Sequence, residues 1–408
     1  MPVDAFVIRD VAIFDAEAAR LRPGLSIRVE RGRIATVGQD VPTSGARLID
    51  GKGRTLLPGL IDCHVHLVLA AGPGEPVNPL ETPASCALRA AANARRTLAA
   101  GFTTVRDLGA PHAVTCDLAR SIAAGESEGP RLIAAGRNIT MTGGHGWMIG
   151  READGPDDVR KAVREQLKAG ARAIKFMASG GVMTPGVDPR SPQLGPDELA
   201  AGIEEAHKAG VRTAAHAQSA QGIRNAVLAG IDSVEHGIYL EDDVIAEMVR
   251  RGTFLSATLI APEAILKLGE AASVPPYMVE KSRMVIEAHR ESFRRALRAG
   301  VRLVMGTDAG TPGNRHGENA QELALMVAQG ATPAQALIAA TANAAELLGL
   351  VEETGRIAPG LAADLLLVDG DPLVDIGILQ QRERLHAIVK EGRLVGGARP
   401  EEFAPLSA

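Results

Sequence analysis

Two histidines separated by one residue mark the first segment of this chain that could carry out chemistry. His64 and His66 lie in the apolar, β-rich segment 60–70. Because alternate residues of a strand share a face, both imidazoles are expected to project into the same site. Such a pair is common by chance, so it predicts a metal site only where further ligand-type side chains join it.

Further ligand-type side chains recur in a repeated unit of the middle of the chain. In each copy a glycine precedes a β-rich run, at Gly101, Gly170, Gly210, Gly230, Gly252 and Gly300. A polar residue follows each glycine at nearly the same spacing; these residues are Asp107, Lys175, His216, His236, Thr258 and Asp308. Equivalent positions of a repeated βα unit lie at the same end of the strands, so these side chains should meet the histidine pair. Four histidines, an aspartate and a lysine in one place favour a metal site over buried structural histidines.

The elements that must position these residues alternate between helix and strand. Amphipathic stretches at 157–169, 196–209 and 282–299 each end at or just before a repeat glycine. Glycine is the usual left-handed residue after a helix, so each unit is interpreted as helix end, turn and strand. With segments 60–70 and 130–136, eight candidate strands alternate with helices. This pattern predicts an α/β fold with a TIM-type (β/α)8 barrel over residues 58–354.

The two ends of the chain have a different pattern. Residues 1–57 and 355–398 alternate polar and apolar side chains between turn dipeptides. This is typical of antiparallel strands with one solvated face. We expect one small β-sandwich domain built from residues 1–57 and 355–408, with the barrel inserted between them.

Composition excludes several classes of function. The chain of 408 residues has 44 Lys and Arg against 49 Asp and Glu, which gives a net charge of −5 and no basic surface for a nucleic acid. Its apolar runs are shorter than the ~20 residues of a membrane helix, and its start, MPVDAFVIRD, lacks the layout of a secretory signal. Three cysteines are too few for a disulfide framework. We therefore expect a cytoplasmic protein with neither a nucleic-acid nor a membrane partner.

Lys175 would repel a divalent cation if it were charged. Burial and a nearby cation lower the pKa of a lysine, and the neutral amine can take up carbon dioxide to become a carbamate that bridges two metal ions. The alternative is an ion pair of Lys175 with Asp308 or Glu235. Imidazole and carboxylate ligands suit zinc best, while manganese, cobalt, nickel and iron remain open.

Five motifs give the chain a strong resemblance to the amidohydrolase superfamily of metal-dependent hydrolases. They are PGLIDCHVHL (58–67), AIKFMASGG (173–181), AAHAQS (214–219), VEHG (234–237) and GTDAG (306–310). The resemblance covers essentially the whole chain and implies a binuclear site with two divalent ions, zinc being expected. It implies that His64, His66 and Asp308 hold the first ion. His216 and His236 would hold the second ion, and carbamylated Lys175 would bridge the two.

Three longer segments resemble the branch of prolidase-like Xaa-Pro dipeptidases and carboxypeptidases, which includes ochratoxin-, phenylurea- and molinate-hydrolysing enzymes. They are residues 142–182, 234–240 and 307–323. This implies a homo-oligomeric enzyme in which a metal-activated hydroxide cleaves an amide beside a terminal carboxylate, in a dipeptide, an N-acyl amino acid or an ochratoxin-like amide. Asp308 would transfer the proton, and His145 would contact the reacting carbonyl or carboxylate. Tyr239 would bind the substrate carboxylate, with Arg315 and His316 as weaker candidates.

Other interpretations stay open. A cyclic-amide hydrolase or deaminase of the same superfamily would use the same metal ligands, and some relatives are non-catalytic scaffolds that lack several of them. A nucleotide-binding protein is disfavoured because the chain has no GxxxxGK[ST] motif. Three further histidines and one cysteine are interpreted as structural; they are His207, His289, His386 and Cys63. Asp107 is interpreted as orienting a neighbouring residue.

Overall fold

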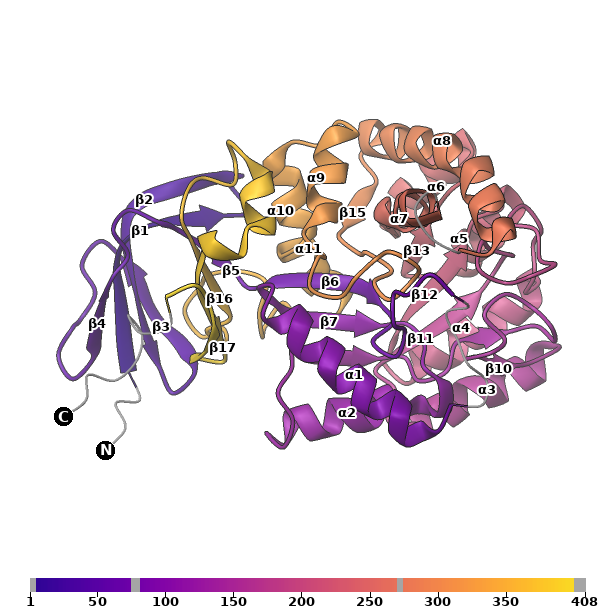
Figure 1. Ribbon diagram of the computed structural model, residues 1–408, viewed down its shortest axis with the longest axis horizontal. Helices are drawn as coiled ribbons and strands as arrows, with labels where there is room; N and C mark the ends of the chain where they lie inside the picture. Colours follow the sequence, from indigo (N-terminus) through magenta and orange to yellow (C-terminus); the bar gives the residue numbers. More distant parts are fainter. Residues whose placement is uncertain (1–4, 75–80, 270–273, 400–408) are drawn as a thin grey trace.

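The computed structural model describes residues 5–74, 81–269 and 274–399. Both ends of the chain contribute to one eight-stranded sheet, in the order β18-β17-β16-β5-β1-β2-β3 with β4 paired to β1, which lies at one end of the molecule (Figure 1). The N-terminal part supplies β1 (Ala5–Asp15), β2 (Arg20–Glu30), β3 (Arg33–Gly38), β4 (Arg47–Asp50) and β5 (Thr55–Pro58). The C-terminal part supplies β16 (Leu365–Val368), β17 (Leu385–Lys390) and β18 (Arg393–Gly396).

This terminal sheet confirms that the two ends pack together, and it corrects the expected strand directions. β16 pairs with β5 in antiparallel register, from Leu365 opposite Pro58 to Val368 opposite Thr55. β1, however, pairs in parallel with both β4 and β5. The expectation of antiparallel strands alone was wrong because polar–apolar alternation is the same for both directions. Residues 1–4 and 400–408 of the predicted sandwich domain lie outside the described residues.

All eight strands predicted for the middle of the chain are present and run parallel. They are β6 (Leu60–Val65), β7 (Phe102–Asp107), β8 (Arg131–Ala134), β11 (Ala173–Met177), β12 (Arg212–Ala217), β13 (Ser233–His236), β14 (Phe254–Ser256) and β15 (Arg302–Val304). Two short strands, β9 (Ile139–Thr140) and β10 (Arg151–Glu152), extend the row. The strands form one sheet of three, β6-β7-β8, and one of seven, β10-β9-β11-β12-β13-β14-β15.

Hydrogen bonds connect the two parallel sheets on both sides. Cys63 N, in β6, donates to Met305 O, just after β15, at 2.9 Å. Arg172 N, just before β11, donates to Ala134 O in β8 at 2.8 Å. The fold is therefore α/β with two parallel sheets lying edge to edge, and the closed (β/α)8 barrel stays a prediction.

Helices cover the outside of the parallel strands (Figure 1). They are α1 (Pro83–Leu98), α2 (Val114–Ala123), α3 (Pro156–Ala169), α4 (Pro196–Lys208), α5 (Ala220–Ala229), α6 (Asp242–Arg251), α7 (Ile260–Gly269), α8 (Pro276–Ala299), α9 (Gln321–Ala328), α10 (Pro333–Ala339) and α11 (Ala342–Leu347). Short 3-10 helices span Pro111–Ala113, Ile376–Gln380 and Arg382–Arg384. The six repeat glycines all have positive φ, from 70° at Gly210 to 98° at Gly170, which confirms the helix–turn–strand interpretation.

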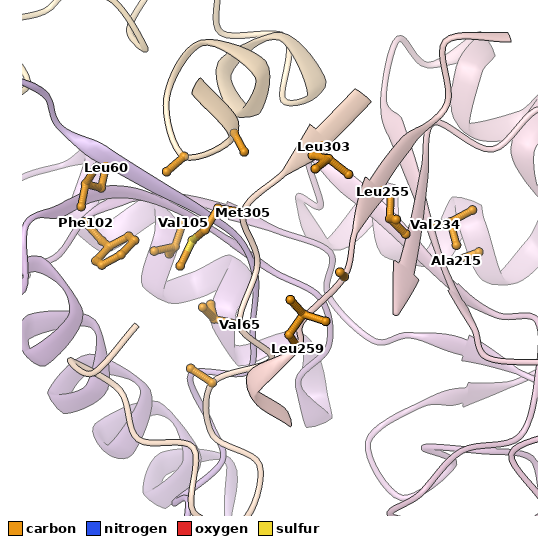
Figure 2. Close-up of a cluster of buried hydrophobic side chains, with 14 of the residues drawn as sticks. Leu60, Val65, Phe102, Val105, Ala215, Val234, Leu255, Leu259, Leu303 and Met305 are labelled. Carbon is orange, nitrogen blue, oxygen red and sulfur yellow. The ribbon is translucent and has the colours of Figure 1, made fainter. Parts of the chain in front are cut away.

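The main hydrophobic core lies between these strands and helices. Figure 2 shows Leu60, Phe102 and Val105 from β6 and β7 near one another, and Val234 and Leu255 from β13 and β14. These side chains are at most 1% exposed. Because parallel strands are buried on both faces, the polar residues at their ends are held by rigid backbone. No helix in the described part of the chain is long and apolar enough to cross a membrane.

Candidate metal centre and active site

His64, His66 and Asp308 converge at the carboxyl ends of β6 and β15. Asp308 Oδ1 lies 3.4 Å from His64 Nε2 and 3.3 Å from His66 Nε2. The ligand atoms that these three residues offer all lie within 4.8 Å of one another. Asp308 N donates to His64 O at 2.7 Å, so the two segments that carry the site are joined directly. The structure brings together these three residues, which the sequence predicted to share one site.

The ring nitrogens that face away from this point are held by the protein. His66 Nδ1 donates to Gly109 O at 2.9 Å, and His64 Nδ1 lies 2.9 Å from Glu235 Oε2. A neutral imidazole has one N–H, so a bond from Nδ1 to a carbonyl leaves the lone pair on Nε2. The lone pair of His66 Nε2 is thereby aimed at the same space as Asp308 Oδ1.

His216 and His236 continue the same group. The His236 ring centroid lies 5.2 Å from that of His64 and 4.6 Å from that of His216. His236 Nδ1 is 2.7 Å from Thr258 Oγ1, and His216 Nε2 donates to Gly180 O at 2.9 Å. The structure thus fixes one ring nitrogen of His66, His216 and His236 by a hydrogen bond, which is the arrangement of metal-ligating histidines.

Three residues of the site adopt a left-handed backbone conformation that residues other than glycine seldom take. φ is 72° at His236, 54° at Thr258 and 61° at Asp308. They follow or end the three consecutive strands β13, β14 and β15. Such conformations cost of order 1–3 kcal/mol each and cluster at functional sites. The backbone here is shaped to direct side chains into one space.

Lys175 lines the same pocket as the four histidines and Asp308, and each of these six residues is less than one-tenth exposed. Burial lowers the pKa of Lys175, while the carboxylates of Glu235 and Asp308 act in the opposite direction. Burial, and then the charge of Lys175, lower the pKa of His64 well below its ordinary value. Burial also lowers the pKa of His66 to about 4. Neutral imidazoles and a lysine that loses its proton readily are the forms that bind divalent metal ions.

The donor set fits a divalent cation. Asp308 Oδ1 is buried and has no hydrogen-bond partner among the described residues. It faces two imidazole nitrogens, and a buried carboxylate oxygen without a donor is unfavourable. Burial raises the pKa of Asp308, although Lys175 opposes this. A bound cation would satisfy the carboxylate and both lone pairs, and nitrogen and oxygen ligands are those that zinc accepts.

A fully buried ion pair supports His64 from behind, and sequence reasoning missed its cationic member. Arg106 Nη2 donates to Glu235 Oε1 at 2.8 Å, and neither side chain is exposed. Arg106 Nε donates to Cys63 O at 2.6 Å, and Ser233 Oγ donates to Glu235 Oε1 at 2.6 Å. The sequence signal was an arginine within the β-rich run 102–107, since a buried arginine is rarely found unless it is paired.

Two buried aspartates brace the histidine segment. Asp107 accepts from Leu67 N at 2.8 Å and from Gly109 N at 3.3 Å. Leu67 follows His66, and Gly109 supplies the carbonyl that accepts from His66 Nδ1. This agrees with the interpretation that Asp107 orients a neighbour. Asp62, which the sequence analysis missed, accepts from His64 N at 3.0 Å and from Thr307 Oγ1 at 2.7 Å. It ties the histidine strand to the segment of Asp308.

The residues predicted to bind substrate are not all brought to the pocket. His145 lines it; its ring centroid lies 4.4 Å from that of His216, and its Nδ1 is 2.8 Å from Thr184 Oγ1. Tyr239 is half-buried against a hydrophobic cluster and does not line the pocket. The side chain of Arg315 is 70% exposed, and its Nη1 lies 3.8 Å from Glu318 Oε1. Arg315 does not line the pocket either. Substrate binding by Tyr239 and Arg315 stays a prediction.

The histidines interpreted as structural, His316 and Cys63 all contact other parts of the chain, and one of these histidines also lines the pocket. His316 Nε2 lies 3.1 Å from His66 O, His207 pairs with Asp232 at 2.8 Å, and Cys63 is in a buried hydrophobic cluster. His386 is buried in β17. His289, which the sequence analysis interpreted as structural, also lines the pocket, and its Nε2 donates to Ala257 O at 2.7 Å. The sequence gave no signal for this, because the strand-end spacing that located the other candidates does not apply to a histidine on a helix.

In α/β proteins built from parallel strands, active sites lie at the carboxyl ends of the strands, and this chain gathers four histidines, a lysine and an aspartate at that end. The chain is a member of the amidohydrolase family, whose model matches residues 55–395. This confirms the resemblance found in the motifs.

Individual relatives agree with the prolidase-like and ochratoxinase-like branch. The ochratoxinase of Aspergillus niger is 32% identical over 400 residues, covering 89% of this chain and 81% of the relative. A solved structure of a Xaa-Pro dipeptidase with bound methionine in the active site is 30% identical, with a TM-score of 0.88 over 96% of this chain and 99% of that chain. A prolidase complexed with N-methylphosphonate-L-proline is 32% identical, with a TM-score of 0.89 over the same shares.

Proposed function

We propose that the protein is a metal-dependent amidohydrolase that cleaves an amide or peptide bond beside a terminal carboxylate, in a dipeptide or an N-acyl amino acid. The observation that carries this proposal is the convergence of Asp308 Oδ1 with the Nε2 atoms of His64 and His66 in a buried pocket. Family membership supports hydrolysis of a C–N bond. The names of the relatives, ochratoxinase, Xaa-Pro dipeptidase and prolidase, support an amide or peptide substrate.

The proposed cofactor is a pair of divalent ions, with zinc expected. His64, His66 and Asp308 would hold one ion, His216 and His236 the other, and a carbamate on Lys175 would bridge them. Bound there, the ions would supply a hydroxide at neutral pH and polarise the scissile carbonyl. The lowered pKa of Lys175 supports carbamylation, because only the neutral amine forms the N–C bond with carbon dioxide, and a proton is released.

Asp308 is the proposed proton carrier. It would accept a proton from the attacking water and deliver it to the leaving nitrogen, which is a poor leaving group until protonated. Its raised pKa suits a carboxyl group that must hold a proton for part of the cycle. His145, fixed by Thr184 beside His216, is placed to contact the carbonyl or the carboxylate of the substrate.

The wider organisation is part of the proposal. The hydrogen bonds between β6 and the end of β15, and between β8 and the start of β11, support one closed (β/α)8 barrel over residues 58–354. The terminal sheet supports a separate small domain from residues 1–57 and 355–408. A homo-oligomer in the cytoplasm stays a prediction from the sequence.

A substrate panel tests the function. Chelator-stripped and zinc-loaded protein would be assayed on dipeptides and N-acyl amino acids, and in parallel on hydantoins, dihydropyrimidines and aminopurines. We expect zinc-dependent release of an amino acid from the open-chain amides. Turnover of only the ring substrates would transfer the assignment to a cyclic-amide hydrolase or deaminase. Zinc binding without turnover of any substrate would favour a non-catalytic protein.

A further inference from the structure

One wall of the pocket is apolar and is built from four separate segments. Val182 follows β11, Ile238 follows β13, Ile265 lies on α7 and Val285 on α8. All four belong to one hydrophobic cluster that is distinct from the main core, and each is at most 7% exposed. We refer to these four residues as the apolar wall.

The pocket carries no charge outside the candidate metal ligands. Among its described lining residues, the other ionisable side chains are His145 and His289. His145 Nδ1 lies 2.8 Å from Thr184 Oγ1, and His289 Nε2 donates to Ala257 O at 2.7 Å, so each ring is held by an uncharged partner. Lys281, on α8, does not line the pocket; its Nζ donates to Thr184 O at 2.7 Å and Val187 O at 2.6 Å.

The apolar wall is held in place by specific bonds. The buried carboxylate of Glu322 accepts from Leu259 N and Ile260 N, both at 2.9 Å, and so fixes the first turn of α7. Tyr277 OH donates to Met183 O at 3.1 Å, and Lys281 bonds the same loop, so that this loop is attached to α8. A wall fixed in this way does not need to be ordered when a ligand binds, which favours affinity for a complementary shape.

The chemistry of the pocket selects one class of side chain. A charged side chain that entered it would lose its water without gaining a counter-ion, which is costly. An apolar side chain would bury its surface against the four wall residues. Met148, Met177 and Met183 also line the pocket, and methionine adapts to ligands of different shape. Both branched and aromatic groups should therefore be accepted.

We propose that the apolar wall receives a bulky, uncharged, apolar side chain of the substrate, of the leucine, methionine or phenylalanine type, and rejects lysine, arginine, aspartate and glutamate at that position. The inference rests on the proposed amide hydrolysis and adds its substrate class. It assigns specificity to residues of α7, α8 and two loops that hold no metal.

The first experiment compares substrates of matched size on the zinc-loaded protein. In dipeptides, the first or the second residue is varied among leucine, methionine, phenylalanine, lysine and glutamate. At one of the two positions we expect kcat/KM for the apolar residues to exceed that for lysine and glutamate by at least about 100-fold. Equal use of charged and apolar residues at both positions would overturn the proposal.

A binding measurement separates failure of this inference from failure of the proposed function. Trp147, the single tryptophan of the chain, lies between Gly146 and Met148, which line the pocket. Its fluorescence can report binding of N-acetyl-leucinamide, N-acetyl-phenylalaninamide and N-acetyl-lysinamide to chelator-stripped protein, which needs no turnover. Preferential binding of the apolar ligands by the stripped protein, together with no turnover of any dipeptide by the zinc-loaded protein, would contradict the proposed function and support the apolar wall. Equal binding of all three ligands would contradict the proposed role of the apolar wall.

A matched pair of variants tests the wall itself. Ile265→Glu introduces a carboxylate into it, whereas Ile265→Gln introduces a neutral group of the same size. Relative to the glutamine variant, the glutamate variant should raise the ratio of kcat/KM for lysine over leucine substrates at least tenfold. Val182→Glu and Val182→Gln provide a second pair at a loop position, should the helix variants fail to fold. A folded glutamate variant with no gain for lysine would refute the assignment.

Discussion

Replacing Arg106 with methionine is expected to destabilise the metal-free protein by about 4 kcal/mol. The guanidinium is fully buried, and it donates to Glu235 at 2.8 Å, to Cys63 O at 2.6 Å and to Ser233 Oγ at 3.1 Å. Methionine has a similar length but no donor, so the carboxylate of Glu235 would be left without a counter-charge in the protein interior.

The magnitude follows from what each lost contact leaves behind. Removing one partner of a buried ion pair costs about 3–5 kcal/mol, because the other charge stays desolvated. An unpaired carbonyl, here that of Cys63, adds about 1 kcal/mol or more. Ser233 Oγ still donates to Glu235 Oε1 at 2.6 Å, so the expected loss of stability stays near the middle of the range for a broken ion pair. The total is a large part of the roughly 5–15 kcal/mol of a typical folded domain.

Equilibrium unfolding in urea, followed by circular dichroism, measures the effect in chelator-stripped protein. Arg106→Lys is the control that keeps the charge and loses the planar fork, and it should cost less than Arg106→Met. The double variant Arg106→Met with Glu235→Gln removes both charges and should be more stable than the sum of the single effects predicts. A loss below about 1 kcal/mol for Arg106→Met, or strict additivity in the double variant, would refute the reasoning.

Three further predictions concern the site. Asp308→Asn should retain most of its bound zinc, because an amide oxygen can still be a ligand, and its kcat should fall at least about 100-fold. Metal analysis and steady-state kinetics measure the two effects, and full activity would remove Asp308 from the mechanism. In Gly181→Ala the added methyl carbon would lie 2.4 Å from His145 Nε2, so the imidazole ring must move. The rate of hydrolysis should fall at least about tenfold at unchanged zinc content, and an unchanged rate would show that His145 does not contact the substrate. Burial lowers the pKa values of His66, His289 and His316 to about 4 from 6.5, so between these values the unfolded chain binds protons more strongly than the folded one. These three histidines should therefore lower the free energy of unfolding of the metal-free protein as pH decreases from about 6.5 to 4, by up to about 3 kcal/mol each, while the raised pKa values of buried carboxyl groups such as Asp107 and Glu322 act in the opposite direction. Urea unfolding of His289→Gln isolates one share: its free energy of unfolding should depend less on pH than that of the unchanged protein, and identical pH profiles would contradict the prediction.

Features set by local pattern could be predicted from the sequence. The glycine after α3, Gly170, ends its helix in the left-handed conformation because the preceding amphipathic stretch needs such a cap. The alternation of His64 and His66 placed both imidazoles on one side of β6, and both face Asp308 in the structure. The spacing after each repeat glycine located the strand ends, so the candidate ligands were found before their geometry was known.

Features that join distant segments could not be predicted in this way. The bond from Arg106 to Glu235 connects β7 to β13 across 129 residues, and a lone arginine in a strand does not identify its partner. The apolar wall depends on how α7 and α8 pack over the loops after β11 and β13. The parallel pairing of β1 with β4 and β5 was missed because side-chain alternation does not depend on strand direction.

Titration of chelator-stripped protein with zinc in bicarbonate buffer, followed by calorimetry, tests the central claim most directly. We predict that the chain binds two zinc ions, and that His66→Ala and His236→Ala each weaken binding while Ile265→Gln does not. Failure to bind zinc, or binding that both histidine variants leave unchanged, would contradict the assignment of these side chains as a metal centre.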